Sequence, residues 1–191
     1  MIMKKLVLLA ILALSSIYTF AQTIEIDKVD EKGDRFISGS LEPIRSLMDK
    51  YYFFVSLDAF QAKDDDEVTY SIVLRTNANV PISVPKGGRL LIKLKDDSVM
   101  ELRTLIEYSD KIGEVVTGAI VHTNYSVSPS FVVTPEQINK ISEGVKKIRL
   151  ETSLDPIDKE FKKDKMGRII KEEYALIQEA LQKEKSFSDG F

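Results

Sequence analysis

Four consecutive acids, Asp64 to Glu67, are the residues of this sequence whose type and spacing best suit a bound cation. Hard oxygen ligands of this kind suit Ca²⁺, but an EF-hand loop alternates its ligands and carries a central glycine, and this stretch does neither. A run of acids at the tip of a hairpin is typical of a solvated loop that discourages edge-to-edge aggregation. We therefore expect a solvated tip and keep Asp64, Asp65, Asp66 and Glu67 as weak metal-ligand candidates.

The chain has few residues that could support nucleophilic catalysis. The sequence contains one histidine, His122, and no cysteine, whereas an activated nucleophile needs a base within hydrogen-bond reach. A lone histidine in a strand is typical of a structural or surface residue. A carboxylate pair could in principle carry out glycosidase-type hydrolysis. With 30 Asp and Glu residues in the chain, however, some pair always lies close to another, so such a pair carries almost no signal. We expect no cofactor.

A short glycine-containing segment, Lys86-Gly87-Gly88-Arg89, has backbone N–H groups that are able to cradle a phosphate. The simpler interpretation is a turn before the next strand, and we expect a turn.

The aromatic run that starts at Tyr51 is the strongest candidate for a binding surface. Period-two alternation gives one face made of Tyr51, Phe53, Val55, Leu57 and Ala59, and a second face made of Tyr52, Phe54, Ser56, Asp58 and Phe60. The second face mixes aromatic and polar groups, as binding surfaces do. Tyr52, Phe54 and Phe60 are therefore candidate contacts for a protein or carbohydrate partner, unless a loop or the C-terminal helix covers them. We expect the C-terminal helix to be the best match for that cover.

The N-terminus has the three-part order of a secretory signal peptide. Lys4 and Lys5 precede an apolar run from Leu6 to Leu14, and small residues stand at the −3 and −1 positions of a cut after Ala21. The apolar run is shorter than the roughly 20 residues that a membrane span needs. We expect export to the periplasm, the cell surface or the medium, with no membrane span in the mature chain.

The charge of the chain argues against nucleic acid as a partner. The net charge is −3 for the 191 residues. Removing residues 1–21, with their two lysines and no acids, leaves 25 − 30 = −5. Proteins that bind phosphate backbones usually carry a basic excess.

Period-two alternation dominates residues 23 to 152 and predicts an antiparallel β domain, most simply a sandwich. The strand register of one hairpin can be predicted, because one pairing places its apolar residues on a single face. That pairing sets Leu94 opposite Met100, Ile92 opposite Leu102 and Leu90 opposite Thr104. This register predicts a three-residue loop at Asp96–Ser98. Since no glycine is present there, Asp97 or Ser98 has to adopt the left-handed conformation.

Two helices are predicted beyond the strands. Thr134-Pro135-Glu136-Gln137 forms a capping box with proline at the first helical position, which predicts a short helix near 135–143. The second, amphipathic helix is predicted over 164–185, with Asp164 as its cap and Glu179–Lys183 as an i,i+4 pair. Its apolar stripe consists of Met166, Ile169, Ile170, Tyr174, Ile177, Ala180 and Leu181.

These patterns divide the chain into a signal peptide at 1–21, a β domain at 22–163, a helix at 164–185 packed on that domain, and a tail at 186–191. Residues 154–164 are the best candidate for a hinge between the β domain and the helix.

Two stretches, Gly87 to Leu102 and Ile148 to Thr152, resemble segments of uncharacterised exported β-rich proteins of Gram-negative bacteria. The resemblance implies a fold class and carries no activity, cofactor or catalytic residue. The sequence therefore favours an exported, non-catalytic binding or structural module of unknown ligand, with an envelope hydrolase that uses a carboxylate-based site as the alternative.

Overall fold

A computed structural model of the chain describes residues 22–44, 51–78, 80–109, 111–117 and 120–188, with side chains described except at 111–124 and 184–188. The predicted signal peptide at 1–21, the side chains of the predicted tail and the side chain of His122 lie outside this description. The protein is mainly β, with 47% strand and 19% helix, and its sheets are antiparallel. This confirms the predicted fold class.

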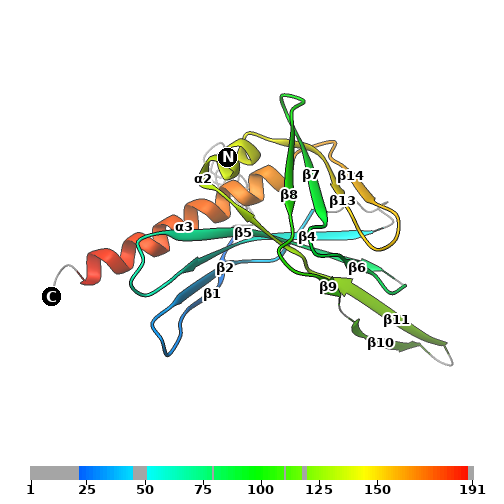
Figure 1. Ribbon diagram of the computed structural model, residues 1–191, viewed down its shortest axis with the longest axis horizontal. Coiled ribbons are helices and arrows are strands. Elements are labelled where there is room, and N and C mark those ends of the chain that lie inside the picture. Colours follow the sequence, from blue (N-terminus) through cyan, green and yellow to red (C-terminus); the bar gives the residue numbers. More distant parts are fainter. Residues whose placement is uncertain (1–21, 45–50, 79, 110, 118–119, 189–191) are drawn as a thin grey trace, which may run out of the picture.

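The large sheet runs through the middle of the molecule (Figure 1). Its order is β1 (Ile24–Val29), β2 (Arg35–Gly39), β4 (Tyr52–Gln61), β5 (Val68–Ala78), β11 (Ile120–Val127) and β10 (Lys111–Thr117), with β3 (Glu42–Pro43) also beside β4 and β12 (Ser130–Val133) also beside β5. The β4–β5 hairpin forms its centre, with Leu57 opposite Ile72 and Phe60 opposite Thr69.

The small sheet has the order β14 (Ile157–Glu160), β13 (Val145–Leu150), β7 (Arg89–Leu94) and β8 (Val99–Arg103). A separate two-stranded ladder joins β6 (Ser83–Val84) to β9 (Tyr108–Ser109). The hinge predicted at 154–164 is wrong in part, because β14 lies within it and pairs with β13. Ile157 and Lys159 alternate into the interior, and that short alternation was the signal for the strand.

The β7–β8 hairpin has a register two residues away from the predicted one. Leu90 lies opposite Leu102 and Ile92 opposite Met100, and Leu94 N–H donates to the carbonyl of Ser98. A shift of two residues keeps every side chain on its predicted face, so the hydrophobic pattern alone could not exclude it. The left-handed residue is Asp97, with φ 70°, which confirms one of the two predicted positions.

Both predicted helices are present. The short helix is α2 (Pro135–Ser142), whose N-cap Thr134 forms the predicted capping box with Gln137. The long helix is α3 (Met166–Ser188), where Gly167 N–H donates to Asp164 Oδ1 over 2.9 Å. The Glu179–Lys183 ion pair measures 2.8 Å, as the spacing predicts.

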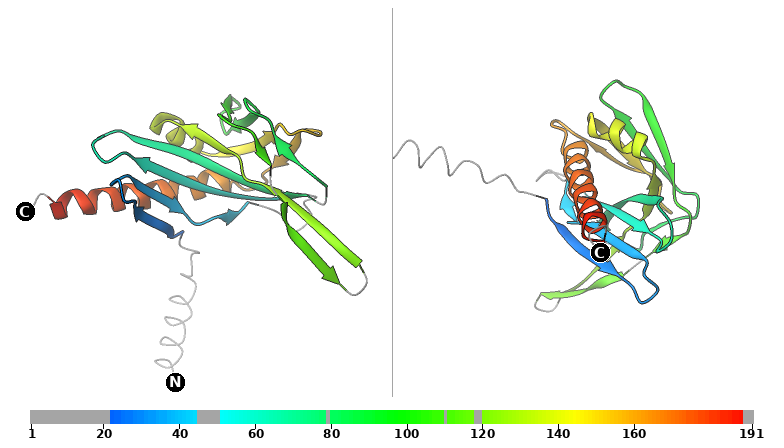
Figure 2. Two further views of the ribbon diagram at one scale, coloured as in Figure 1. Left: turned by 60° about the horizontal axis from the view of Figure 1, so that its bottom comes forward. Right: turned by 90° about the vertical axis from the view of Figure 1, so that its left-hand side faces the viewer.

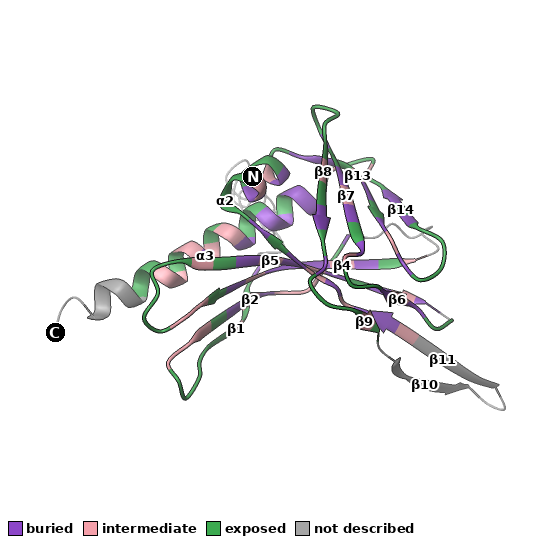
Figure 3. Ribbon diagram, in the orientation of Figure 1, coloured by how far each residue is buried: buried purple, intermediate pink, exposed green. Residues whose placement is uncertain are grey.

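The core lies between the large sheet, the small sheet and the two helices (Figure 2). The large sheet contributes Ile72 and Phe131, the small sheet Ile92 and Ile148, and all four side chains are fully buried. Burial along α3 is concentrated in its N-terminal half, where it contacts α2 (Figure 3). Within the described part of the chain, no helix combines the length and the apolar character that crossing a membrane requires.

Candidate functional site

The helix α3 covers the face of the large sheet that carries Val55, Leu57 and Tyr70, which we call the inner face. The Tyr174 ring of α3 packs edge-on against Tyr70, with 5.4 Å between the ring centroids. Gln178 Nε2 donates to the Tyr70 hydroxyl over 2.6 Å. The apolar stripe of α3 thus meets the most apolar side of the β4–β5 hairpin, where its burial stabilises the fold most.

Tyr52, Phe54 and Phe60 lie on the opposite side of the same strand, which we call the outer face. Tyr52 is 42% exposed and Phe60 is 43% exposed, while Phe54 is half-buried. The expectation that the C-terminal helix covers these three residues is therefore wrong. The prediction that they share one face is confirmed by their register with Asn77, Arg75 and Thr69 of β5.

The structure does not bring these three aromatic residues into one cluster. Tyr52 and Phe60 lie at opposite ends of β4, eight residues apart. At about 3.3 Å per residue the two positions are separated by roughly 26 Å. The outer face therefore has two aromatic ends rather than one continuous platform.

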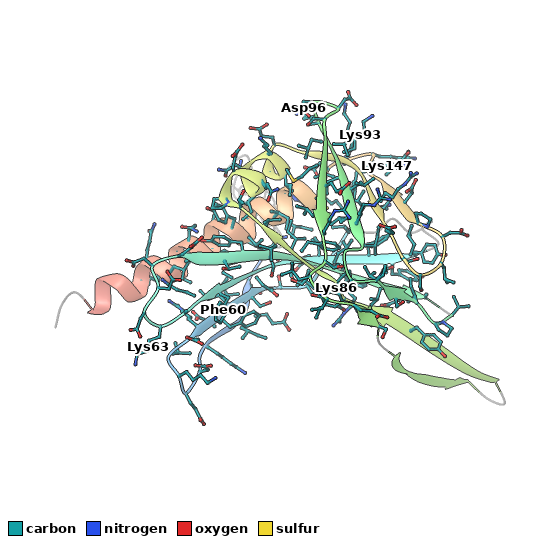
Figure 4. All side chains as sticks on the ribbon, in the orientation of Figure 1. Phe60, Lys63, Lys86, Lys93, Asp96 and Lys147 are labelled. Carbon is teal, nitrogen blue, oxygen red and sulfur yellow. The ribbon has the colours of Figure 1, made fainter. Side chains whose placement is uncertain are left out.

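Phe60 gains a neighbour that sequence reasoning missed. Phe36 of β2 lies directly opposite Phe60 and is 38% exposed. One row along, Val132 of β12 lies opposite Ser71 and is 47% exposed. We call Phe36, Phe60 and Val132 the outer-face patch, and Figure 4 labels Phe60 beside β2.

Asp58 places a carboxyl group within this outer face. Its Oδ1 accepts a hydrogen bond from Ser38 Oγ over 2.7 Å, and Ser38 and Asp58 are paired across β2 and β4. Burial raises the pKa of Asp58, and the hydrogen bond from Ser38 partly offsets that effect. The outer-face patch therefore consists of the Phe36–Phe60 pair and of Val132, which stands at the end of the adjacent row behind Ser38, Asp58 and Ser71.

The carboxyl groups do not converge on a shared, accessible position. Among the described residues, a raised carboxyl pKa is found at Asp58 and at Glu173. Glu173 has no exposed surface and lies on the inner side of the sheet, where it accepts a hydrogen bond from Leu57 N–H. Asp58 is close enough to disfavour a negative charge on Glu173, but Glu173 itself has no surface open to a substrate.

The acidic loop lies between β4 and β5, with Asp64, Asp65, Asp66 and Glu67 all exposed. Asp65 Oδ1 accepts a hydrogen bond from Glu67 N–H over 2.8 Å, which uses one carboxylate oxygen to shape the turn. Within the described residues, no group of three or more acidic, histidine or cysteine side chains is arranged to hold a metal ion.

Gly87 and Gly88, the alternative phosphate cradle, form a turn. Gly87 N–H donates to the carbonyl of Thr104, and Gly88 N–H donates to the carbonyl of Pro85. Both N–H groups are used within the protein, and Arg89 is paired with Glu151 over 2.9 Å. The expected turn is confirmed.

A hollow of about 620 Å³ lies on the outward side of the small sheet, where Figure 4 labels Lys93 and Lys147. Lys93 and Lys146 both pair with Asp97, at 3.0 Å and 2.8 Å. Lys147 pairs with Asp158 over 2.8 Å. Each of these three lysines is thus paired with an acid of the sheet or of its hairpin loop, which reduces the attraction of the hollow for an anion.

Two further hollows share Arg35 in their lining. One lies between the β1–β2 hairpin and the C-terminal half of α3, and the other lies between that hairpin and the β4–β5 loop, where Asp64, Asp65 and Asp66 line it. Arg35 is held there by Asp27 over 2.8 Å. None of the three hollows is lined by a residue of the outer-face patch. Comparisons of the chain with protein-family models, with curated proteins and with solved structures find no match.

Proposed function

We propose that this protein is an exported, non-catalytic binding module that contacts a partner protein through the outer-face patch. The observation that carries the proposal is the cross-strand pair Phe36–Phe60. Both rings keep about two-fifths of their surface exposed, at 38% and 43%, while Ile37 and Ala59 on the inner face of the same strands are buried.

The composition of the patch suits a protein surface. Phenylalanine is enriched in the cores of protein–protein interfaces, and charged residues are depleted there. Phe36 and Phe60 are direct cross-strand neighbours. The adjacent row on the same face contains Ser38, Asp58 and Ser71 and ends at Val132. Because no described hollow opens on the patch, its shape suits an extended macromolecular surface better than a small ligand.

Export is supported by the N-terminal pattern of basic residues, apolar run and small residues at the cut. A protein outside the inner membrane has partners in the periplasm, at the cell surface or in the medium, so the experiment belongs in intact cells.

A photoreactive phenylalanine analogue placed at Phe60 tests the proposal. The matched control places the same analogue at Val99, which is 61% exposed on the small sheet. Irradiation of the cells should give a discrete protein adduct from the probe at Phe60 and none from the probe at Val99. Equal adducts from both sites, or no adduct from Phe60, would contradict the proposal. An adduct that contains carbohydrate alone would overturn the choice of a protein partner.

A further inference from the structure

The pairing of β4 with its neighbours on one side is interrupted at its centre. β2 pairs with β4 up to Ser38 opposite Asp58, and β3 resumes the pairing with Glu42 opposite Val55. Between these two points Leu57 N–H donates to Oε2 of Glu173, a side chain of α3, over 2.6 Å. A helix side chain therefore supplies the acceptor that a neighbouring strand would supply in an unbroken ladder.

The backbone around the interruption leaves just enough room for this carboxyl group. A Cβ atom at Gly39 would lie 2.5 Å from Glu173 Cδ, so that only glycine leaves the space open. Glu173 is 0% exposed, and its second oxygen, Oε1, has no hydrogen-bond partner among the described residues. Either protonation state leaves Oε1 without a partner, but the ionised form also buries an unpaired charge, which is the greater cost.

The charges around Glu173 add to this cost. Glu42 of β3, Asp58 of β4 and Glu172 of α3 are all acidic and disfavour a further negative charge. Burial is the larger cause, and together these effects raise the pKa of Glu173 to about 8 even though Leu57 N–H favours the ionised form.

Two cations on the elements packed against α3 are paired with acids. On β2, Arg35 is held by Asp27 of β1. On α2, Lys140 is held by Glu136 over 2.8 Å. On β5, Tyr70 contributes a neutral hydroxyl group that accepts from Gln178. Among the described residues, neither Arg35 nor Lys140 is left to pair with Glu173.

We propose that Glu173 is a protonation-controlled latch: its neutral carboxyl group holds α3 in the gap between β2 and β3, and ionisation of that group releases the helix from the large sheet. Release would uncover Leu57 and Ile72 of the inner face together with Ile170 and Ile177 of the helix, all of them fully buried in the docked state. The latch does not depend on the proposed binding function.

The pH range of the latch follows from the two states of the carboxyl group. The pKa in the docked state is about 8, and the ordinary value of a glutamate is 4.5. The docked state therefore binds more protons between these values and is favoured as the pH falls. The undocking equilibrium constant should rise about tenfold per pH unit across this range, by about three-thousandfold in total, and should level off above about pH 8.

Hydrogen exchange of the mature chain, followed from pH 5 to pH 9 and corrected for intrinsic exchange rates, tests the latch. Protection of α3 should fall steeply with rising pH, while protection of β7 and β13 in the small sheet should change much less. In Glu173→Gln, which imitates the neutral carboxyl group, protection of α3 should be independent of pH over this range. Glu179→Gln, an exposed position on the same helix, should keep the wild-type dependence.

Three results would overturn the latch. One is protection of α3 that does not change with pH in the wild-type protein. Another is an equal loss of protection in the small sheet, because that would be global unfolding. The third is an unchanged pH dependence in Glu173→Gln. Should that variant fail to fold, a carbon NMR titration of the wild-type Glu173 carboxyl group decides: titration near pH 8 supports the latch, and titration near pH 4.5 overturns it.

Discussion

Gly39→Ala is the substitution whose effect follows most directly from the geometry of α3 on the large sheet. The added methyl group would lie 2.5 Å from Cδ and from Oε2 of Glu173, and 2.9 Å from Oε1. Gly39 is not among the glycines with positive φ, so alanine meets no torsional penalty there. Elsewhere in a strand, the exchange of glycine for alanine would be neutral or favourable by roughly 0.5–1 kcal/mol.

The magnitude follows from overpacking a full interior. Inserting a methylene-sized group into a well-packed site costs about 1–3 kcal/mol. We therefore expect Gly39→Ala to lower the free energy of unfolding by that amount. The collision is with one side chain, so the penalty should depend on the residue at position 173.

A double-mutant cycle isolates this dependence. Glu173→Ala removes the acceptor of Leu57 N–H, which by itself costs about 1–3 kcal/mol. It also clears the space that the new methyl group needs, so in this background Gly39→Ala should cost little. The expected coupling energy between the two positions is about 1–3 kcal/mol.

Urea unfolding of the four proteins at pH 6, where Glu173 is neutral, measures the coupling. The wild-type protein, both single variants and the double variant should unfold with equal m-values, which makes their free energies comparable. If Gly39→Ala has the same effect with and without Glu173, within about 0.5 kcal/mol, the described contact is not present in solution.

The remaining predictions concern the helix, the acidic loop and the N-terminus. Ile177→Ala removes a fully buried side chain of α3 and should lower the free energy of unfolding by about 2–5 kcal/mol. Leu176→Ala, at the half-buried neighbouring position, should lower it by less than about 1 kcal/mol. Equal losses of stability in urea unfolding would contradict the described helix face. Millimolar Ca²⁺ should leave the melting temperature unchanged if the acidic loop is only a solvated tip. A site of micromolar affinity would instead raise the free energy of unfolding by about 4 kcal/mol at a thousandfold excess of Ca²⁺. An upward shift of the melting temperature that is lost when serines replace the four acids would establish a metal site. Mass spectrometry of the protein from its native cells should find Gln22 at the N-terminus, and an intact Met1 would refute export with cleavage.

Local signals in the sequence predicted most of the individual elements. The capping box at Thr134 placed α2. The absence of glycine at the β7–β8 turn narrowed the left-handed residue to Asp97 or Ser98, and the structure places it at Asp97. The alternation in β4 separated its inner face from its outer face. Each of these depends on neighbours only a few residues away in the chain.

Long-range pairing was not predictable in the same way. Phe36 and Phe60 meet because β2 pairs with β4, and no local pattern fixes which strands become neighbours. The β7–β8 register was wrong by two residues because turn geometry, rather than hydrophobicity, distinguishes registers that keep the same face.

The prediction placed α3 on the outer face of the large sheet, which is wrong. It gave the aromatic residues of the outer face more weight than the apolar residues of the inner face. Glu173 was missed although it lies within the apolar stripe of α3, three residues after Ile170 and four before Ile177. An acid at a buried position of an amphipathic helix is itself a signal that a partner group lies opposite.

Hydroxyl-radical oxidation of Phe36 and Phe60, compared between the purified mature protein and intact cells, tests the central claim that the outer-face patch is a binding surface. Leu105, which is 66% exposed outside the patch, serves as the internal reference. We predict that oxidation of both phenylalanines, relative to Leu105, is high in the purified protein and falls severalfold in cells. The same ratio in both samples would show that nothing covers the patch where the protein works, and would contradict the proposed function.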